Sequence, residues 1–181
     1  MVTSVILVRH AASEGVMSKN DSEFGLTSAG ESQARKTALF LKGVVFSRVF
    51  VSSMRRAKET AKVITNQEVV LCDELREFNK IVFEDQPEDT DMFNHDVERA
   101  LNVKAFFEEV LRKHRDSKIL IVSHGNVIRY LVCCSLKLKP HKAPNFFVDN
   151  SSITQLFFDG NELVSVGCVN STAHLFLEEK N

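Results

Sequence analysis

Three short apolar runs constrain the fold of this chain more than any other feature. They are residues 5–8, 49–51 and 119–122. Each run is short and continuously apolar, as a strand is when a parallel sheet buries it on both faces. Patterns of helical spacing lie between the runs, so strand and helix alternate along the chain. This order predicts a three-layer α/β/α sandwich with a mostly parallel central sheet.

The sequence LTSAGE marks the start of the first expected helix. Its apolar face carries four residues at helical spacing, Ala34, Ala38, Leu41 and Val45. Ser28 and Glu31 have the spacing of a capping box, which predicts that Ser28 is the N-cap of the helix.

Three more helices and a hairpin complete the expected fold. The second helix begins near Met54, the third covers about residues 93–114, and the fourth follows His124. Two β-rich runs, residues 151–159 and 162–169, are joined by the sequence DGN, which is typical of a hairpin turn.

Length and composition limit the classes of protein to which the chain can belong. With 181 residues, 44% of them hydrophobic, the chain fits one domain over residues 1–181 with a single core. A net charge of -1 argues against a nucleic-acid binder held by bulk charge.

Cysteine usage and hydropathy bear on the compartment. The four cysteines lack metal-ligand spacing, which favours free thiols in a reducing compartment. No apolar window is long enough for a membrane span, and no secretory leader opens the sequence. As written, the chain is expected to be cytoplasmic, or mitochondrial if a leader is missing from it.

Charged and titratable side chains follow each apolar run. They are Arg9 and His10 after the first run, Arg56 after the second and His124 after the third. The carboxyl ends of parallel strands meet at one edge of a sheet, where helix N-termini also point. We therefore expect these four side chains to form one cluster.

This combination of residues is suited to phosphoryl transfer. Arginine binds phosphate oxygens bidentately, and an imidazole near its ordinary pKa is a neutral nucleophile at neutral pH. The leaving oxygen needs a proton donor, and Glu77 in DELREF is the candidate. A metal site is disfavoured because no helix carries two histidines at ligand spacing and the two arginines would repel a cation.

The order of short motifs resembles the histidine phosphatase superfamily, also called phosphoglycerate-mutase-like. The motifs are RH (Arg9, His10), LTxxGxxQA (Leu26, Thr27, Gly30, Gln33, Ala34), SSxxRAxxTA (residues 52–61), LRE (residues 75–77) and HG (His124, Gly125). The resemblance covers residues 5–152. It implies that His10 becomes a phosphohistidine, that Glu77 is the general acid, and that no cofactor or metal is required. The residues expected to bind the substrate are Arg9, Arg56, His124, Ser13 and Gly125.

Within the superfamily, SHGNVIRYLVCCSLKLKP and NSSIT are similar to a branch of mitochondrial, mutase-like Ser/Thr protein phosphatases. That branch also replaces the glycine after the RH pair, which is Ala11 here. As written, the chain is not expected to carry the membrane anchor or the multimerisation segment of that branch, and a homodimer or larger homo-oligomer is one expectation for its oligomeric state. The closing NSTAHL resembles a tail of small-molecule phosphatases in the superfamily.

The residues leave several activities open. Residues 84–98 contain seven acidic side chains and no Lys or Arg, and over a site they would repel a strongly anionic sugar phosphate, unless solvent screens them. A phosphatase acting on phosphoprotein or a weakly anionic phosphomonoester is therefore favoured. The alternatives are a small-molecule phosphatase, a phosphoglycerate mutase, or a phosphoprotein-binding scaffold that has lost catalysis.

Overall fold

The computed structural model describes residues 2–15, 23–78 and 91–177; the side chains of residues 91–96 are not described. Within these ranges the strands are β1 (Thr3–Arg9), β2 (Arg48–Ser52), β3 (Val69–Cys72), β4 (Lys118–Ser123), β5 (Ile153–Asp159) and β6 (Glu162–Ser171). The helices are α1 (Ser28–Phe40), α2 (Arg55–Ile64), α3 (Asp91–Lys113) and α4 (Gly125–Ser135), and the short 3₁₀ helices are η2 (Asp73–Leu75), η3 (Pro140–Asn145) and η4 (Ala173–Phe176).

The strands form one sheet in the order β3-β2-β4-β1-β5-β6. β1 and β2 both pair parallel with β4, and β3 pairs parallel with β2. β5 runs antiparallel to β1, and the hairpin partner β6 runs antiparallel to β5. The predicted mostly parallel sheet and the predicted hairpin are therefore confirmed, and the run at residues 5–8 lies in a central strand.

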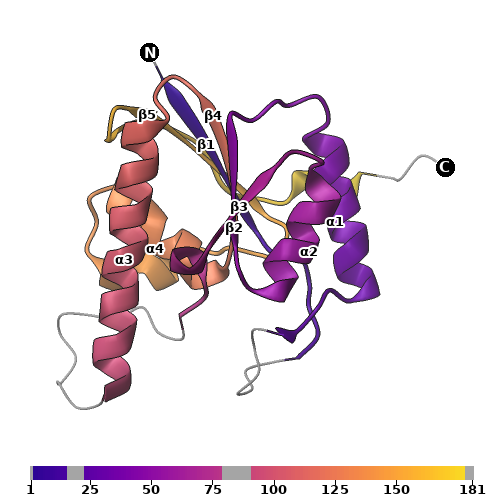
Figure 1. Cartoon of the computed structure of the whole chain (residues 1–181), viewed down its shortest axis with the longest axis horizontal. Coiled ribbons are helices and arrows are strands. Elements are labelled where there is room, and N and C mark those ends of the chain that lie inside the picture. The colour runs from indigo at the N-terminus through magenta and orange to yellow at the C-terminus, as the bar shows by residue number, and fades with distance from the viewer. Residues whose placement is uncertain (1, 16–22, 79–90, 178–181) are drawn as a thin grey trace.

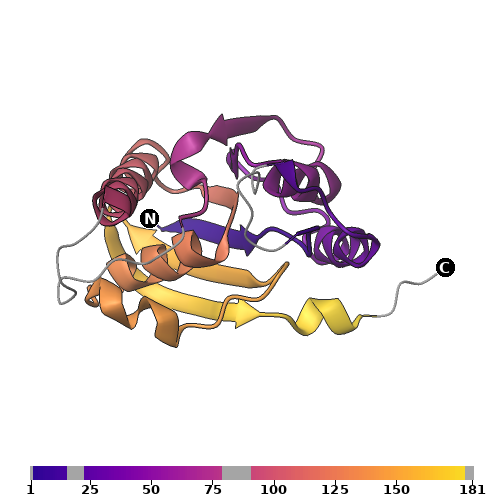
Figure 2. The ribbon, with the colours of Figure 1, turned by 90° about the horizontal axis from the view of Figure 1, so that it is seen from below.

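Helices cover both faces of the sheet, with α1 and α2 on one side and α3 and α4 on the other (Figures 1 and 2). Alternate residues of each buried strand point to opposite faces. In β1, Val5 and Leu7 belong to the core beneath α3 and α4, whereas Ile6 and Val8 belong to the core beneath α1 and α2. This arrangement is the three-layer sandwich that the alternating pattern predicts.

The chain leaves β1 and β4 toward opposite faces of the sheet. α1 follows β1 on one face and α4 follows β4 on the other, although the two strands are neighbours. In open α/β sheets a crevice opens at the carboxyl ends of such a pair of strands. His10 and His124 are the residues that follow these two strands.

The first helix differs from its prediction at both ends. Its N-cap is Thr27, whose hydroxyl accepts the Gly30 N–H, so the Ser28 capping box is wrong because that serine already lies inside the helix. The helix ends at Phe40, and Gly43 takes a left-handed conformation with φ 82°. Val45 therefore lies beyond the helix and is 78% exposed, which contradicts its prediction as part of the apolar face.

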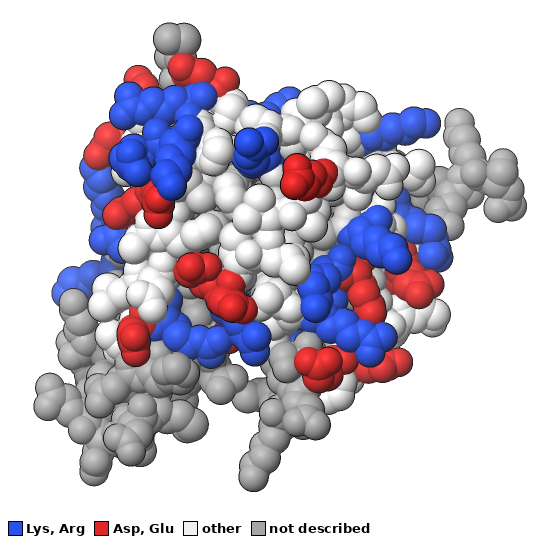
Figure 3. Space-filling view, in the orientation of Figure 1, with Lys and Arg blue, Asp and Glu red and all other residues white. Residues whose placement is uncertain are grey.

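β3 is an edge strand that sequence analysis missed. It has only four residues, and Val69, Val70 and Leu71 are exposed, so its apolar run does not reflect burial. On the face shown in Figure 3, basic and acidic side chains are interspersed around an uncharged central area. No helix of the described ranges is long and apolar enough to cross a membrane.

Candidate active site

His10 lies at the carboxyl end of β1 with only 5% of its surface exposed. Its backbone N–H donates to the carbonyl of Ser123 at the end of β4 (2.8 Å). The ring Nδ1 is 2.8 Å from the Ala11 carbonyl, which can only accept, so Nδ1 carries the proton. The lone pair of the neutral ring is therefore on Nε2.

Arg56 from α2 lies against this nitrogen. Its Nε–H donates to His10 Nε2 over 3.2 Å, and the arginine itself is buried. Burial lowers the pKa of His10 to about 3, and the charges of Arg56 and Arg9 act in the same direction. His10 is thus a neutral imidazole with an available lone pair at physiological pH.

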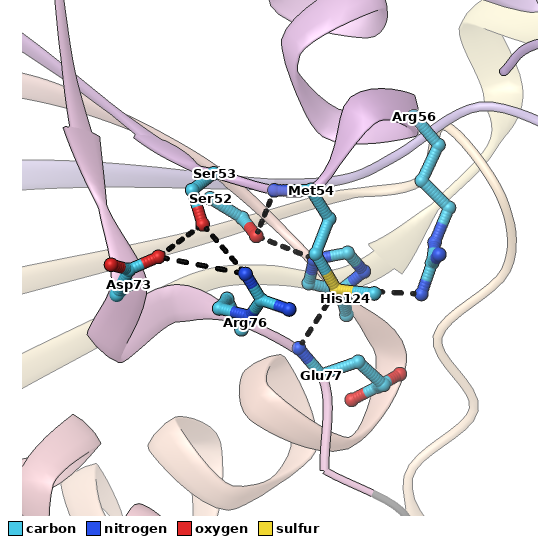
Figure 4. A network of polar contacts seen from close by, with 8 residues as sticks. All are labelled: Ser52, Ser53, Met54, Arg56, Asp73, Arg76, Glu77 and His124. Atoms are coloured by element: carbon cyan, nitrogen blue, oxygen red, sulfur yellow. Dashed lines mark hydrogen bonds and ion pairs between the residues drawn. The ribbon is translucent and has the colours of Figure 1, made fainter. Parts of the chain in front are cut away.

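His124 lies beside His10, with the ring centroids 5.1 Å apart. It is fully buried, and burial holds its pKa well below the ordinary value. Its Nε2 is 2.7 Å from Ser52 Oγ, at the end of β2. Ser52 Oγ accepts the Met54 N–H at 3.3 Å and can donate its own proton to Nε2 (Figure 4). In that tautomer Nδ1 of His124 carries a proton, and Nδ1 is a buried atom without a hydrogen-bond partner.

Ser52 is thereby a positioning residue that sequence analysis did not single out. We expect Ser52→Ala to lower kcat by about 10-fold, the value of one hydrogen bond, because His124 Nε2 loses its donor and Nδ1–H is no longer favoured. Steady-state kinetics with an aryl phosphate measure this. The control is Ser53→Ala, because the Ser53 hydroxyl bonds to Asp73 and not to His124. Equal losses in the two variants would contradict the role of Ser52.

Arg9 approaches the cluster from the end of β1. One terminal nitrogen donates to the Val148 carbonyl (2.7 Å), while its buried Nε has no hydrogen-bond partner. A Cβ placed on Gly125 would lie 3.6 Å from Arg9 Nε and 3.8 Å from Glu77 Oε2. The absent side chain of Gly125 therefore leaves open the space between an arginine and a carboxyl group.

Glu77 follows η2 and brings the carboxyl group to the cluster. The N–H groups of Asn126 and Phe78 donate to its Oε1 at 3.2 and 3.3 Å. Burial raises the pKa of Glu77 to about 7, against the lowering effect of these bonds and of the nearby arginines. Figure 4 shows the side chains of Glu77 and Arg56 beside His124. A carboxyl group with this pKa can hold a proton at neutral pH.

The LTxxGxxQA motif supports the backbone just after His10. The Ala12 N–H donates to Gln33 Oε1 (2.9 Å), and the Ala12 carbonyl accepts the Thr27 N–H (3.0 Å). A Cβ on Gly30 would come within 1.9 Å of that carbonyl, so only glycine fits there. The motif residues thus fix the loop that carries His10 and do not themselves contact its ring.

Ala11 is accommodated without strain. Its methyl group is fully buried, and its φ is not in the left-handed region that would demand glycine. Its N–H donates to Thr60 Oγ1 (3.0 Å), and that hydroxyl donates to the Arg56 carbonyl (2.7 Å). The final part of the SSxxRAxxTA motif therefore also supports the nucleophile loop.

The structure brings five of the predicted residues together and places the others around them. The five are Arg9, His10, Arg56, Glu77 and His124. Gly125 begins α4 between two of these side chains. Ser13 pairs with Leu26 in an isolated bridge, and no hydrogen bond of its side chain to the cluster is found among the described residues. Arg129 also lies near Arg9, whose pKa its charge lowers, and sequence analysis did not single it out.

Among the described side chains, the other histidines and the cysteines are not members of this cluster. His174 is buried and His114 packs against Phe50, as packed side chains do, and the side chain of His95 lies outside the described residues. All four cysteines are free, with Cys72 and Cys133 buried. Within the described part of the chain, no three His, Cys, Asp or Glu side chains are grouped so that they could hold a metal ion.

Comparison with known proteins defines the class. The family model of the histidine phosphatase superfamily (branch 1) matches residues 5–171. The chain therefore belongs to the histidine phosphatase superfamily, and the predicted resemblance is confirmed.

Two relatives point to one branch of this family. The mitochondrial serine/threonine-protein phosphatase Pgam5 of Drosophila virilis is 31% identical over 185 residues, which cover 94% of this chain and 64% of the relative. Pgam5 of Drosophila persimilis is 32% identical over 186 residues, with the same coverage. This chain thus spans about 64% of the length of these relatives. The predicted similarity to the branch of Ser/Thr phosphatases is confirmed.

Solved structures share the fold. Phosphoserine phosphatase from Entamoeba histolytica, in complex with 3-phosphoglyceric acid, has a TM-score of 0.80 and 25% identity, covering 96% of this chain and 100% of its own. Bacillus stearothermophilus YhfR has a TM-score of 0.77 at 18% identity and covers 96% of this chain, which shows the fold alone. The phosphoglycerate-mutase-like fold is therefore confirmed.

Proposed function

We propose that this chain is a phosphatase that works through a phosphohistidine on His10. One observation carries the proposal: Arg56 Nε–H points at the unprotonated Nε2 of a buried, neutral His10 (3.2 Å). A neutral imidazole held against a guanidinium is a nucleophile with its anion-binding group already in place. Family membership supports a phosphomonoester as the substrate.

In the first step His10 Nε2 attacks phosphorus in line with the leaving oxygen. The P–N bond forms as the bond from phosphorus to the leaving oxygen breaks, and Glu77 gives its proton to that oxygen. The Arg56 Nε–H, which donates to His10 Nε2 in the free protein, donates to a phosphoryl oxygen instead once the substrate is bound. Arg9 Nε–H and His124 Nδ1–H, which are buried without protein partners, donate to the other oxygens.

In the second step water replaces the imidazole. The Glu77 carboxylate accepts a proton from the water as its oxygen attacks phosphorus, the P–N bond breaks, and inorganic phosphate leaves. Glu77 is then protonated again and His10 is neutral, as at the start. The residues in these roles need no metal or other cofactor.

We further propose that the substrate is phosphoserine or phosphothreonine in a protein, or a weakly anionic phosphomonoester. Two observations support this choice: the names of the Drosophila relatives, and the seven acidic residues between positions 84 and 98. Residues 84–90 lie outside the described ranges, and Glu98 on α3 is exposed. An acidic segment over the site would favour substrates with little negative charge beyond the phosphate itself.

A small-molecule phosphatase is the second candidate. The likeness to Entamoeba phosphoserine phosphatase, solved with 3-phosphoglyceric acid, favours it. A mutase would have to hold a bisphosphorylated intermediate, which an acidic segment over the site would repel.

A panel of substrates distinguishes these activities. We expect the highest kcat/KM on phosphoserine and phosphothreonine peptides, lower values on free phosphoserine, and no interconversion of 2- and 3-phosphoglycerate in the presence of 2,3-bisphosphoglycerate. The matched comparison is a peptide with acidic flanking residues against the same peptide with neutral ones, which should be turned over faster. Robust mutase turnover beside inert peptides would overturn the substrate proposal.

A phosphoprotein-binding scaffold is separated from an enzyme by a simpler assay. We expect turnover of p-nitrophenyl phosphate that vanadate inhibits and a chelator leaves unchanged. Binding of phosphopeptides without any turnover of this substrate would favour the scaffold.

Three further proposals concern domain organisation, assembly and compartment. We propose that residues 1–181 act as one histidine phosphatase domain, which the family match over residues 5–171 supports. The exposed apolar edge of β3 is the surface on which we would first test for a second copy. A reducing compartment fits the four free cysteines, and a mitochondrial location fits the names of the relatives.

A further inference from the structure

The NSTAHL segment buries a histidine that the mechanism above does not use. His174 in η4 is 2% exposed, and its ring lies 5.4 Å from the ring of Phe40 on α1. Lys36 Nζ ties the same segment to α1 by donating to the Leu175 carbonyl (2.8 Å). Figure 2 shows η4 beyond the end of β6, below α1.

The hydrogen bonds of His174 determine its tautomer. Its Nε2 is 3.1 Å from the Ser151 carbonyl and 3.0 Å from Thr37 Oγ1. A carbonyl can only accept, so Nε2 carries the proton. The Thr37 hydroxyl donates its own proton to the Gln33 carbonyl (3.0 Å) and can accept from the imidazole. His174 therefore donates to both partners, and burial lowers its pKa so that the ring stays neutral.

Ser151 connects His174 to the strand that carries the nucleophile. Its backbone N–H donates to the carbonyls of Arg9 (3.1 Å) and His10 (3.3 Å). Ser151 is fully buried and has φ 59°, a left-handed conformation that a non-glycine residue keeps only when its surroundings hold it. The hydrogen bond from His174 holds this residue from its carbonyl side. Asn150 Nδ2 adds a bond to the His10 carbonyl (2.9 Å).

The second partner of His174 leads to the other side of the nucleophile loop. Thr37 and Gln33 lie one turn apart on α1, and Gln33 Oε1 accepts the Ala12 N–H (2.9 Å). His174 is thus bonded directly to Ser151 in the loop before β5, and it reaches the support on α1 indirectly, through the Thr37 hydroxyl that bonds to the Gln33 carbonyl.

We propose that His174 is a positioning residue that keeps His10 in line for attack, acting through Ser151 and α1. Attack at phosphorus depends on the position of Nε2 to within a fraction of an ångström, and a displacement of 1 Å can cost about 100-fold in rate. The role rests on the proposed function of His10 as the nucleophile.

The test replaces His174 by phenylalanine, which keeps a ring against Phe40 but has no N–H. We expect kcat on an aryl phosphate, and the rate of phosphoenzyme formation in rapid-quench experiments, to fall by about 10- to 100-fold. KM should change by no more than about threefold, because Arg9 and Arg56 still bind the phosphate. The matched control is Lys36→Met, which removes a different hydrogen bond between α1 and the same segment and leaves Ser151 untouched. This variant should keep kcat within about twofold of the wild-type value.

Two further variants separate positioning from general stability. His174→Gln restores a side-chain N–H and should recover most of the lost kcat. Ser151→Gly removes the need to hold a strained φ, so His174→Phe should cost less kcat in that background. Two results would overturn the proposal. One is a loss of kcat in Lys36→Met equal to that in His174→Phe. The other is an effect of His174→Phe on kcat that is as large in the Ser151→Gly background as in the wild-type protein.

The wild-type protein separates failure of this inference from failure of the proposed function. If wild-type protein forms no phosphohistidine, the proposed function fails. If wild-type and His174→Phe form it equally fast, only the role of His174 fails. Should His174→Phe not fold, His174→Asn, whose amide is too short to reach the Ser151 carbonyl, replaces it with the same expectations.

Discussion

His10→Ala is expected to lower turnover of every phosphomonoester by on the order of 10⁴-fold or more, as loss of a covalent nucleophile does. The reason is geometric. Nε2 of this buried ring carries the lone pair toward which the Arg56 Nε–H points, and no other imidazole of the cluster can replace His10 as the nucleophile. His124 Nε2 is bonded to Ser52, so its ring is committed to another role.

Rapid mixing with ³²P-labelled substrate followed by alkaline quench measures the phosphoenzyme. Wild-type protein should carry an acid-labile, alkali-stable label on His10, and His10→Ala should carry none while still binding phosphopeptide, which makes it a substrate trap. The control is His141→Ala, a partly exposed histidine away from the strand ends. A label that persists in His10→Ala would show that another residue is the nucleophile.

Glu77→Gln should separate substrates by their leaving groups. The amide keeps an oxygen that can accept the Asn126 and Phe78 N–H groups but cannot donate the carboxyl proton. We expect kcat/KM on an alkyl phosphate such as a phosphoserine peptide to fall by about 10²- to 10³-fold, the usual contribution of a general acid. An aryl phosphate, whose leaving oxygen needs no proton, should lose less than about 10-fold.

The pH profile gives an independent measurement on the same residue. Attack requires neutral His10, whose pKa is lowered to about 3, and protonated Glu77, whose pKa is raised to about 7. Activity on an alkyl phosphate should therefore rise through the lower value, decline as pH rises through about 7, and lose that alkaline limb in Glu77→Gln.

The matched control for Glu77 is Glu74→Gln, the same change at an exposed position of η2. It should leave both the rates and the pH profile unchanged. Equal losses of Glu77→Gln on alkyl and aryl phosphates would contradict the role as general acid.

Much of this site could be predicted because its residues follow strands that are recognisable from sequence. The runs before His10 and His124 are continuous and apolar, and both strands are buried. Parallel strands bring their carboxyl ends together, so adjacency in space follows from local pattern alone. Glu77 follows no such strand. It was predicted because the leaving oxygen needs a proton donor, which the arginines and histidines of the cluster do not supply.

The supporting residues could not be predicted in this way. Ser52, Thr60 and Ser151 are ordinary small polar residues, and their bonds to His124 and to the segment at residues 9–11 join positions 49 or more apart in the chain. β3 was also missed, although it carries a short apolar run of its own, Val69–Cys72, and the first three residues of this run are exposed at the edge of the sheet rather than buried on both faces.

The sequence by itself determined the class of fold, the family and the five side chains of the cluster, because hydrophobic periodicity and short motifs are local properties of the chain. Only the tertiary structure decided that Arg56 donates to Nε2 of His10, that Ser52 bonds to Nε2 of His124, and that Glu77 has a pKa of about 7. These properties depend on burial and on hydrogen bonds between distant segments. They exist only once β1, β2 and β4 have brought His10, Ser52 and His124 together.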